Sequence, residues 1–203
     1  LYDRGKTKIV QCPLGKSGDL NVAREVKYIN DFAFRSCTKI NTINLTDEVL
    51  MVGNGAFSGC SSLSTVYLPN SITSIGQMAF YKCENLTDIK IPSKVKSIGA
   101  QTFSGSGLRS VQFSSGITSI SKGAFFDCKG LARVTIPESV KSIGRGAFSR
   151  CANLESVTFL GDAPSASSDA FAGTSPTIYY TAETEGWSEQ FSGLNTEETT
   201  SQP

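Results

Sequence analysis

The sequence is organised by a repeat of about 23 residues. Seven phenylalanines follow one another at spacings of 23, 23, 23, 22, 23 and 23 residues: Phe34, Phe57, Phe80, Phe103, Phe125, Phe148 and Phe171. The clearest unit reads Ile72-xx-Ile75-Gly76-xx-Ala79-Phe80-xx-Cys83-xx-Leu86-xx-Ile89-x-Ile91-Pro92. One unit cannot bury its own apolar side, so successive units must stack and share one continuous core. The period therefore predicts a solenoid.

Each coil is predicted to contain a short strand and a tight turn. Apolar and polar residues alternate around Val66 and its equivalents, which is typical of a strand, and proline at 69, 92 and 137 ends it. The Ala-Phe-xx-Cys segment predicts a single helical or 3-10 turn. Four glycines follow the second apolar residue, where a turn with unusual φ is expected: Gly53, Gly76, Gly99 and Gly144, with Asn30 at the same place in the first coil. The fold class is thus a β-rich solenoid of about seven coils.

Five of the six cysteines occupy one position of the repeat: Cys37, Cys60, Cys83, Cys128 and Cys151. A structural zinc site needs thiols that converge on one point, whereas these are spread along the solenoid axis, so no metal is expected. Disulfides between adjacent coils remain possible by distance, but parallel side chains oppose them and Ser106 interrupts the series. We favour buried free thiols that fill a tight turn. Cys12 lies outside the series and is expected to be the most accessible thiol.

Composition excludes several classes of function. The chain has no histidine, so Ser-His-Asp triads and histidine-ligated zinc cannot operate. With 19 Lys and Arg against 18 Asp and Glu, the net charge of +1 provides no general attraction to nucleic acid. No apolar run approaches the roughly 18–20 residues that a membrane span needs, so direct membrane insertion is not expected. The Ser104–Gly107 stretch lacks the Lys-Ser/Thr of a phosphate loop. We expect no catalytic residue and no cofactor.

The repeat resembles the BspA-type leucine-rich repeat, and the resemblance covers about Val22 to Phe171. The segments Cys12–Lys16, Gly161–Pro164 and Thr177–Trp187 also look like the flanks of that family. The resemblance implies a right-handed superhelix, an exported protein at the cell surface or outside the cell, and use in adhesion or protein binding. It implies no catalytic residues. Because the chain starts at Leu1 and shows no signal-peptide segment, we expect a trimmed mature fragment or a piece made for expression. The resemblance implies that such domains are often part of a longer chain.

We predict one domain over residues 1–203. Residues 1–25 are expected to form an N-terminal lead-in or cap, 26–160 the regular repeats, 161–194 an incomplete last coil with its cap, and 195–203 a flexible tail. Trp187 and Phe191 are the expected aromatic anchors of that cap. The loop between Phe103 and Leu108 is one residue short, so this coil must be tightened or bent.

The outward positions of the strand column form the candidate partner-binding face, because solenoids commonly bind through such a surface. The candidate residues are Asn44, Tyr67, Asp88, Lys90, Gln112 and Arg133. Tyr67, Lys90 and Arg133 are the predicted anchors, since tyrosine and arginine are enriched at binding hot spots. This polar face of mixed charge suits a protein or glycan partner, although it is also compatible with a merely soluble surface. The oligomeric state stays open, with a monomer expected.

A second candidate is an apolar docking patch made by Tyr28, Leu50 and Met51, at positions where most other coils carry polar residues. The patch could dock a partner or a second copy. It could also be covered by residues 1–21, which is the alternative that we favour. The sequence as a whole predicts a non-enzymatic surface module for binding or adhesion. The alternatives are a scaffold or targeting module within a larger surface protein and, from a different class, an enzyme, against which the missing histidine argues.

Overall fold

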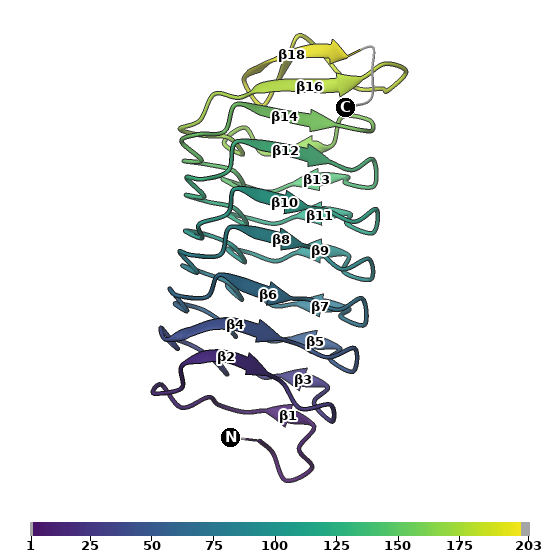
Figure 1. Ribbon diagram of the computed structural model, residues 1–203. Helices are drawn as coiled ribbons and strands as arrows, with labels where there is room; N and C mark the ends of the chain where they lie inside the picture. The colour runs from purple at the N-terminus through teal and green to yellow at the C-terminus, as the bar shows by residue number, and fades with distance from the viewer. Residues whose placement is uncertain (1, 200–203) are drawn as a thin grey trace.

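The computed structural model describes residues 2–199, and they wind into a β-solenoid of about eight coils stacked along one axis (Figure 1). No residue within 2–199 is helical. The predicted solenoid is therefore confirmed. The chain forms one more coil than expected. Within the predicted lead-in or cap, residues 2–25 complete a coil of their own, in which β1 pairs with β3 and β2 pairs with β4.

Two columns of strands run along the solenoid. The front column consists of β2 (Gly18–Asn21), β4 (Ile40–Asn44), β6 (Thr65–Tyr67), β8 (Asp88–Lys90), β10 (Ser110–Gln112), β12 (Arg133–Ile136), β14 (Ser156–Phe159), β16 (Thr177–Thr181) and β18 (Leu194–Thr199). The back column consists of β1 (Lys8–Ile9), β3 (Tyr28–Ile29), β5 (Met51–Val52), β7 (Ser74–Ile75), β9 (Ser97–Ile98), β11 (Ser119–Ile120), β13 (Ser142–Ile143) and β15 (Ser165–Ala166). Where neighbouring strands of a column pair, the pairing is parallel and joins equivalent repeat positions, such as Ile43 with Val66. In the front column β10 and β12 are not paired. The remaining strand, β17 (Gln190–Phe191), pairs antiparallel with β18.

The core is a stack of the repeated phenylalanines. Consecutive rings from Phe34 to Phe171 lie 5.1–5.4 Å apart between centroids, with interplanar angles of 3–21°. The rings of Phe34 through Phe148 are essentially inaccessible to solvent. Offset stacking adds to the free energy that burial of each ring already contributes. The phenylalanine period in the sequence is thus the axial period of the core.

The Ala-Phe-xx-Cys segment is not helical, which corrects the predicted single helical or 3-10 turn. In the first copy, Phe32 and Ser36 have φ of 57° and 58°, and this left-handed conformation prevents a helix from continuing. Backbone amides instead alternate between two kinds of acceptor. The amide of Cys37 donates to the carbonyl of Phe34 within the turn (3.0 Å), and the amide of Phe34 donates to the carbonyl of Ala56 in the next coil (2.7 Å).

Gly53, Gly76, Gly99 and Gly144 do not adopt positive φ, which corrects the second expectation for the turn. Space explains these glycines. A Cβ atom built on Gly76 would lie 2.5 Å from the backbone nitrogen of Asn54, and one built on Gly53 would lie 2.5 Å from that of Asp31. At Gly53 and Gly76 the coils therefore approach each other too closely for a side chain. The corner has more room at Gly99, where the nearest atom would lie 3.2 Å from a Cβ, and Asn30 and Ser121 carry side chains at the same repeat position.

The shortened coil closes around Ser106 and Gly107. Ser106 continues the cysteine series, since its hydroxyl lies 3.4 Å from the Sγ atom of Cys128. The amide of Gly107 donates to the carbonyl of Cys83 (3.2 Å), and a Cβ atom at Gly107 would overlap the carbonyl oxygen of Glu84. The predicted tightening or bending of this coil thus falls on the turn at Gly107, which packs directly against the preceding coil.

At one junction both strand columns are interrupted. β6 is not paired with β8, and β7 is not paired with β9, while the turns still bond across this junction, as from Phe80 to Thr102 (2.8 Å). The sequence offers a reason. Pro92 supplies no amide donor to the preceding coil, whereas Leu160 at the equivalent repeat position donates to the carbonyl of Ile136 (3.0 Å). In the preceding coil the Ser71 hydroxyl donates to the carbonyl of Val49 (2.7 Å), but Lys94 stands at the equivalent position at this junction.

The C-terminal end is more ordered than the sequence suggested. Residues 165–166 form β15, although the apolar pair of the other coils is missing there. Strand β18 pairs with β16, which corrects the flexible tail predicted for residues 195–203. Residues 200–203 of that predicted tail lie outside the described residues. Trp187 packs at 4.9 Å from Phe159 and 5.0 Å from Tyr180, so the predicted aromatic cap forms.

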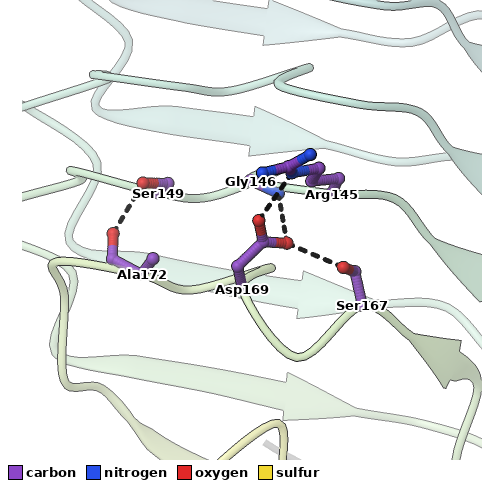
Figure 2. A network of polar contacts seen from close by, with 6 residues as sticks. All are labelled: Arg145, Gly146, Ser149, Ser167, Asp169 and Ala172. Carbon is purple, nitrogen blue, oxygen red and sulfur yellow. Dashed lines mark hydrogen bonds and ion pairs between the residues drawn. The ribbon is translucent and has the colours of Figure 1, made fainter.

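A polar network fastens the last turn to the coil before it (Figure 2). The carboxylate of Asp169 accepts hydrogen bonds from the Ser167 hydroxyl (2.7 Å), the Arg145 Nε (2.9 Å) and the Gly146 amide (3.3 Å). The Ser167 hydroxyl first, and then Arg145, hold the pKa of Asp169 below its ordinary value. The carboxylate is therefore charged at neutral pH and accepts all three hydrogen bonds in that form.

Candidate binding surface

The front column presents two rows of outward side chains. In one row Asn44 is in register with Tyr67, and Lys90 with Gln112. In the other row Asp88 is in register with Ser110, and Arg133 with Ser156. All six predicted residues are exposed, and they lie on β4, β6, β8, β10 and β12 of the front column. Alternation along each strand causes this arrangement, because the residues between them face the core.

The predicted anchors differ in their surroundings. The Tyr67 side chain is 57% exposed, the largest exposure of an aromatic residue within 2–199. The Arg133 guanidinium lies 3.9 Å from the Glu155 carboxylate, and both side chains are mostly exposed, so this ion pair contributes little to stability. Lys90 is exposed and has no ion pair within the described chain. Asn44 already donates to Asn21 (2.8 Å), which leaves it less free for a partner.

Two hollows on or beside the front column are lined by predicted anchors. The larger, about 670 Å³, is called the Tyr67 hollow and is lined by Arg24, Glu25, Leu45, Thr46, Asp47, Glu48 and Tyr67. The smaller, about 290 Å³, is lined by Arg133, Val134, Thr135, Ser156, Thr158, Tyr179 and Thr199. Each hollow therefore contains one predicted anchor. The sequence did not reveal the corner residues of the Tyr67 hollow, because they come from turns whose side chains follow no apolar period.

The apolar patch lies on the back column. Met51 is in register with Tyr28, and Leu50 and Met51 are 37% and 40% exposed. Residues 2–21 do not cover Leu50 and Met51 as we favoured; they continue the solenoid as a further coil, which stacks beside Tyr28. The Lys8 ammonium lies 5.7 Å from the centre of the Tyr28 ring, which leaves Tyr28 half-buried. Docking at this patch stays a prediction.

The cysteine series is a column of free, buried thiols. Each of four Sγ atoms donates to the carbonyl of the phenylalanine in the coil below, as from Cys60 to Phe34 (3.0 Å) and from Cys151 to Phe125 (3.1 Å). Burial raises the pKa of Cys60 from its ordinary 9.0 to about 12 and that of Cys128 to about 11. Such thiols are poor nucleophiles at neutral pH. Cys12 is the most accessible of the six, as predicted, yet only 8% of it is exposed.

The thiols make the fold sensitive to alkali. Their pKa is raised by folding, so their stabilising contribution is complete below pH 9 and is lost as the pH rises toward about 11–12. We expect the urea midpoint to fall steadily between pH 9 and pH 11, and to fall less for Cys128→Ala.

At pH 8 a thiol reagent should label the native chain slowly and should count six thiols in denaturant without reductant. A count below five would instead indicate disulfides.

Two other kinds of site, metal centres and membrane-spanning helices, are not found among the described residues. Within residues 2–199, no three His, Cys, Asp or Glu side chains gather in a way that could hold a metal ion. The same residues contain no helix that is long and apolar enough to span a membrane. The features that remain are polar surfaces, hollows and an extended face built from repeated strands. They define the class of the protein as a β-solenoid repeat protein.

The comparison with protein families identifies the particular repeat. The model of the BspA type leucine rich repeat region matches six copies, over residues 15–132 and 75–185. The chain therefore belongs to the BspA-type leucine-rich repeat family, as the motif predicted. The comparison with curated protein sequences found no match.

Solved structures of leucine-rich repeat proteins share the fold. The T. pallidum leucine rich repeat protein is 24% identical, with a TM-score of 0.56 and coverage of 90% of this chain and 82% of that one. A leucine-rich repeat protein from Bacteroides ovatus is 25% identical, with a TM-score of 0.55; the match covers 80% of this chain and 55% of that longer protein. A leucine rich cell surface protein from Faecalibacterium prausnitzii is 19% identical, with a TM-score of 0.54 and coverage of 91% and 79%.

Proposed function

We propose that the chain is a non-enzymatic binding or adhesion module, located at the cell surface or outside the cell, that holds a protein or glycan partner against its front column. The observation that carries the proposal is the exposed, polar outer face of that column, on which Tyr67 and Arg133 each line a hollow. A cell surface protein among its structural neighbours supports the location. The buried thiols, with their raised pKa, argue against nucleophilic catalysis.

An array of glycans and extracellular host proteins tests this function directly. At least one partner should bind the purified domain reproducibly in physiological salt. Silence across the whole array would contradict the adhesion proposal and favour the second candidate, a scaffold or targeting module within a larger surface protein. The longer Bacteroides ovatus protein, of which this chain spans 55%, supports that second candidate.

Replacement of the three anchors tests the surface. For a partner found on the array, Tyr67→Ala/Lys90→Ala/Arg133→Ala is expected to weaken binding at least about thirtyfold, the loss of one hot spot of about 2 kcal/mol. The matched control is Thr73→Ala/Lys96→Ala/Lys141→Ala, which removes two cations and one polar residue from the back column. Equal affinities of the two variants, measured by surface plasmon resonance, would show that the front column is not the binding face.

A further inference from the structure

The interruptions of the two strand columns at β6 and β7 are parts of one continuous seam. No backbone hydrogen bond joins residues 64–75 to residues 87–98, all of which the structure describes. Most Cα–Cα distances between β6 and β8 exceed 8 Å, whereas most of those between β8 and β10, which are equally long and paired, do not. The step between β7 and β9 is also visibly wider than the steps between the other back strands (Figure 1). The strands on the two sides of the seam are therefore separated.

Core residues beside the seam are less well covered than their equivalents. Leu68 and Ile75 are 8% and 5% exposed, whereas Ile91 and Ile98, at the same repeat positions in the next coil, are 1% and 0% exposed. Val66, on β6, is only half-buried, although it packs against the core. These side chains keep some contact with solvent because the strand of the next coil lies farther away than elsewhere. Their exposure is independent of the hydrogen bonds and indicates the same separation.

The corner after β9 shows how far the seam extends. Among the described residues, the amide of Gly99 donates to no backbone carbonyl, although the equivalent amide of Ser121 donates to that of Ile98 (2.9 Å). A Cβ atom built on Gly99 would lie 3.4 Å from the backbone nitrogen of Gln77 in the preceding coil. The corresponding distance at Gly76 is 2.5 Å. The wider spacing of the coils thus continues from the strands to this corner.

The turn that follows the corner remains tightly bonded across the same two coils. The amides of Met78, Phe80 and Lys82 donate to carbonyls of the next coil at 2.8–3.0 Å. The Phe80 ring also stacks on Phe103 (5.4 Å). One edge of the solenoid is therefore continuous where its front and back columns are both interrupted. A bonded edge between two packed bodies is the arrangement of a hinge.

We propose that residues 2–75 and 87–199 form two rigid halves that rotate about the turn at residues 76–86, so that the seam widens and narrows. Narrowing exchanges hydrogen bonds to water for bonds to the facing strand, and such an exchange changes the free energy of the chain little. Two bonds that would close the seam are missing, because Pro92 has no amide hydrogen and Lys94 stands in place of a serine donor. The seam is thus able to change its width at small cost.

The seam divides the candidate partner-binding face. Asn44 and Tyr67 lie on its N-terminal side, and the other four predicted residues, from Asp88 to Arg133, lie on its C-terminal side. A partner that contacts both Tyr67 and Lys90 therefore binds across the seam and favours the width that it fits best. This consequence rests on the proposed function of the front column, whereas the hinge itself does not.

Double electron–electron resonance between spin labels tests the hinge in the free chain. Met51→Cys/Ser119→Cys places labels on β5 and β11, three coils apart on opposite sides of the seam. Ser97→Cys/Ser165→Cys is the matched pair, because β9 and β15 are also three coils apart but belong to one unbroken sheet. We expect the distance distribution of the first pair to be about twice as broad, or to have two peaks, because only this pair spans the hinge. Labelling of the wild-type chain measures any contribution of the native thiols.

A repair variant shows whether the seam is the source of the motion. Pro92→Ala/Lys94→Ser supplies the missing amide and hydroxyl donors, so it should narrow the distribution of the seam-spanning pair to that of the matched pair. It should also slow hydrogen exchange of the Gly99 amide about tenfold in NMR spectra. Pro137→Ala, at the equivalent position beside the paired strands β11 and β13, should change neither result.

Two results would overturn the proposal. Equal widths for the two pairs in the otherwise wild-type chain would show that the solenoid is rigid across the seam. A broad distribution that the repair variant leaves unchanged would place the motion elsewhere in the chain. The array experiment requires no motion of the chain, so a failure of the hinge and a failure of the binding proposal are distinguishable.

Discussion

Phe80→Ala is expected to lower the free energy of unfolding by about 3–5 kcal/mol. Phe80 is fully buried and its ring stacks on Phe57 below (5.2 Å) and on Phe103 above (5.4 Å). The substitution removes the buried ring and leaves a cavity that the rigid stack on either side cannot close. In a solenoid each coil touches only its neighbours, so one cavity in the middle weakens two coil interfaces at once. Urea unfolding followed by circular dichroism measures the loss.

Two controls make the phenylalanine prediction specific. Tyr67→Ala removes an aromatic ring of similar size from the surface and should change stability by no more than about 0.5 kcal/mol. Phe171→Ala should cost less than Phe80→Ala, because Phe171 stacks on one ring of the series, Phe148, rather than on two. A loss below about 1.5 kcal/mol for Phe80→Ala would mean that the stack does not dominate the core.

Gly76→Ala is expected to cost about 2–3 kcal/mol, although it adds one methyl group. The new Cβ atom would lie 2.5 Å from the backbone nitrogen of Asn54 and 2.6 Å from the carbonyl carbon of Gly53. Backbone atoms cannot rotate away as a side chain can, so the two coils must separate and stretch the hydrogen bond from the Gly76 amide to the Val52 carbonyl (2.8 Å). Thermal and urea unfolding of the variant give the cost.

Gly99 and Gly15 separate this explanation from a general effect of glycine. Gly99 occupies the same repeat position, but its nearest neighbours to a new Cβ lie at 3.2 Å and 3.4 Å, so Gly99→Ala should cost clearly less. Gly15 has nothing within 4 Å, and Gly15→Ala should be nearly neutral. Equal losses at Gly76 and Gly99 would refute the close approach of coils as the cause.

The repeat predicts which residues are buried, but it does not predict the conformation of the turns. Apolar repeat positions such as Ile43 and Val134 were predicted to be buried, and they are, because burial of a column depends only on period and on stacking. The Ala-Phe-xx-Cys turn is predicted as helical and is not, because it contains left-handed residues. In the first copy these are Phe32 and Ser36, whose side chains do not predict a positive φ. Residues 195–199 lie in the predicted flexible tail, yet they belong to a strand, because β18 pairs with β16.

The candidate surface shows the same division. Alternation along the strands predicts that Tyr67, Lys90 and Arg133 lie on the outside of the front column, and all three are exposed there. It could not show that Tyr67 shares a hollow with Thr46 and Asp47, which belong to the corner of the preceding coil. Side chains that meet at a corner do so according to the path of each turn, and this path varies between coils while the period stays constant.

The sequence by itself determined the solenoid, its columns of phenylalanine and cysteine, and its family, because a side chain that recurs every 23 residues must meet its own copies when coils stack. Only the tertiary structure decided where coils approach too closely for a Cβ atom, where both columns are interrupted, and which corner forms a hollow. These features depend on distances between neighbouring coils. Such distances are set by left-handed turn residues and by individual exceptions to the repeat, such as Lys94 and Gly107, which a period does not record.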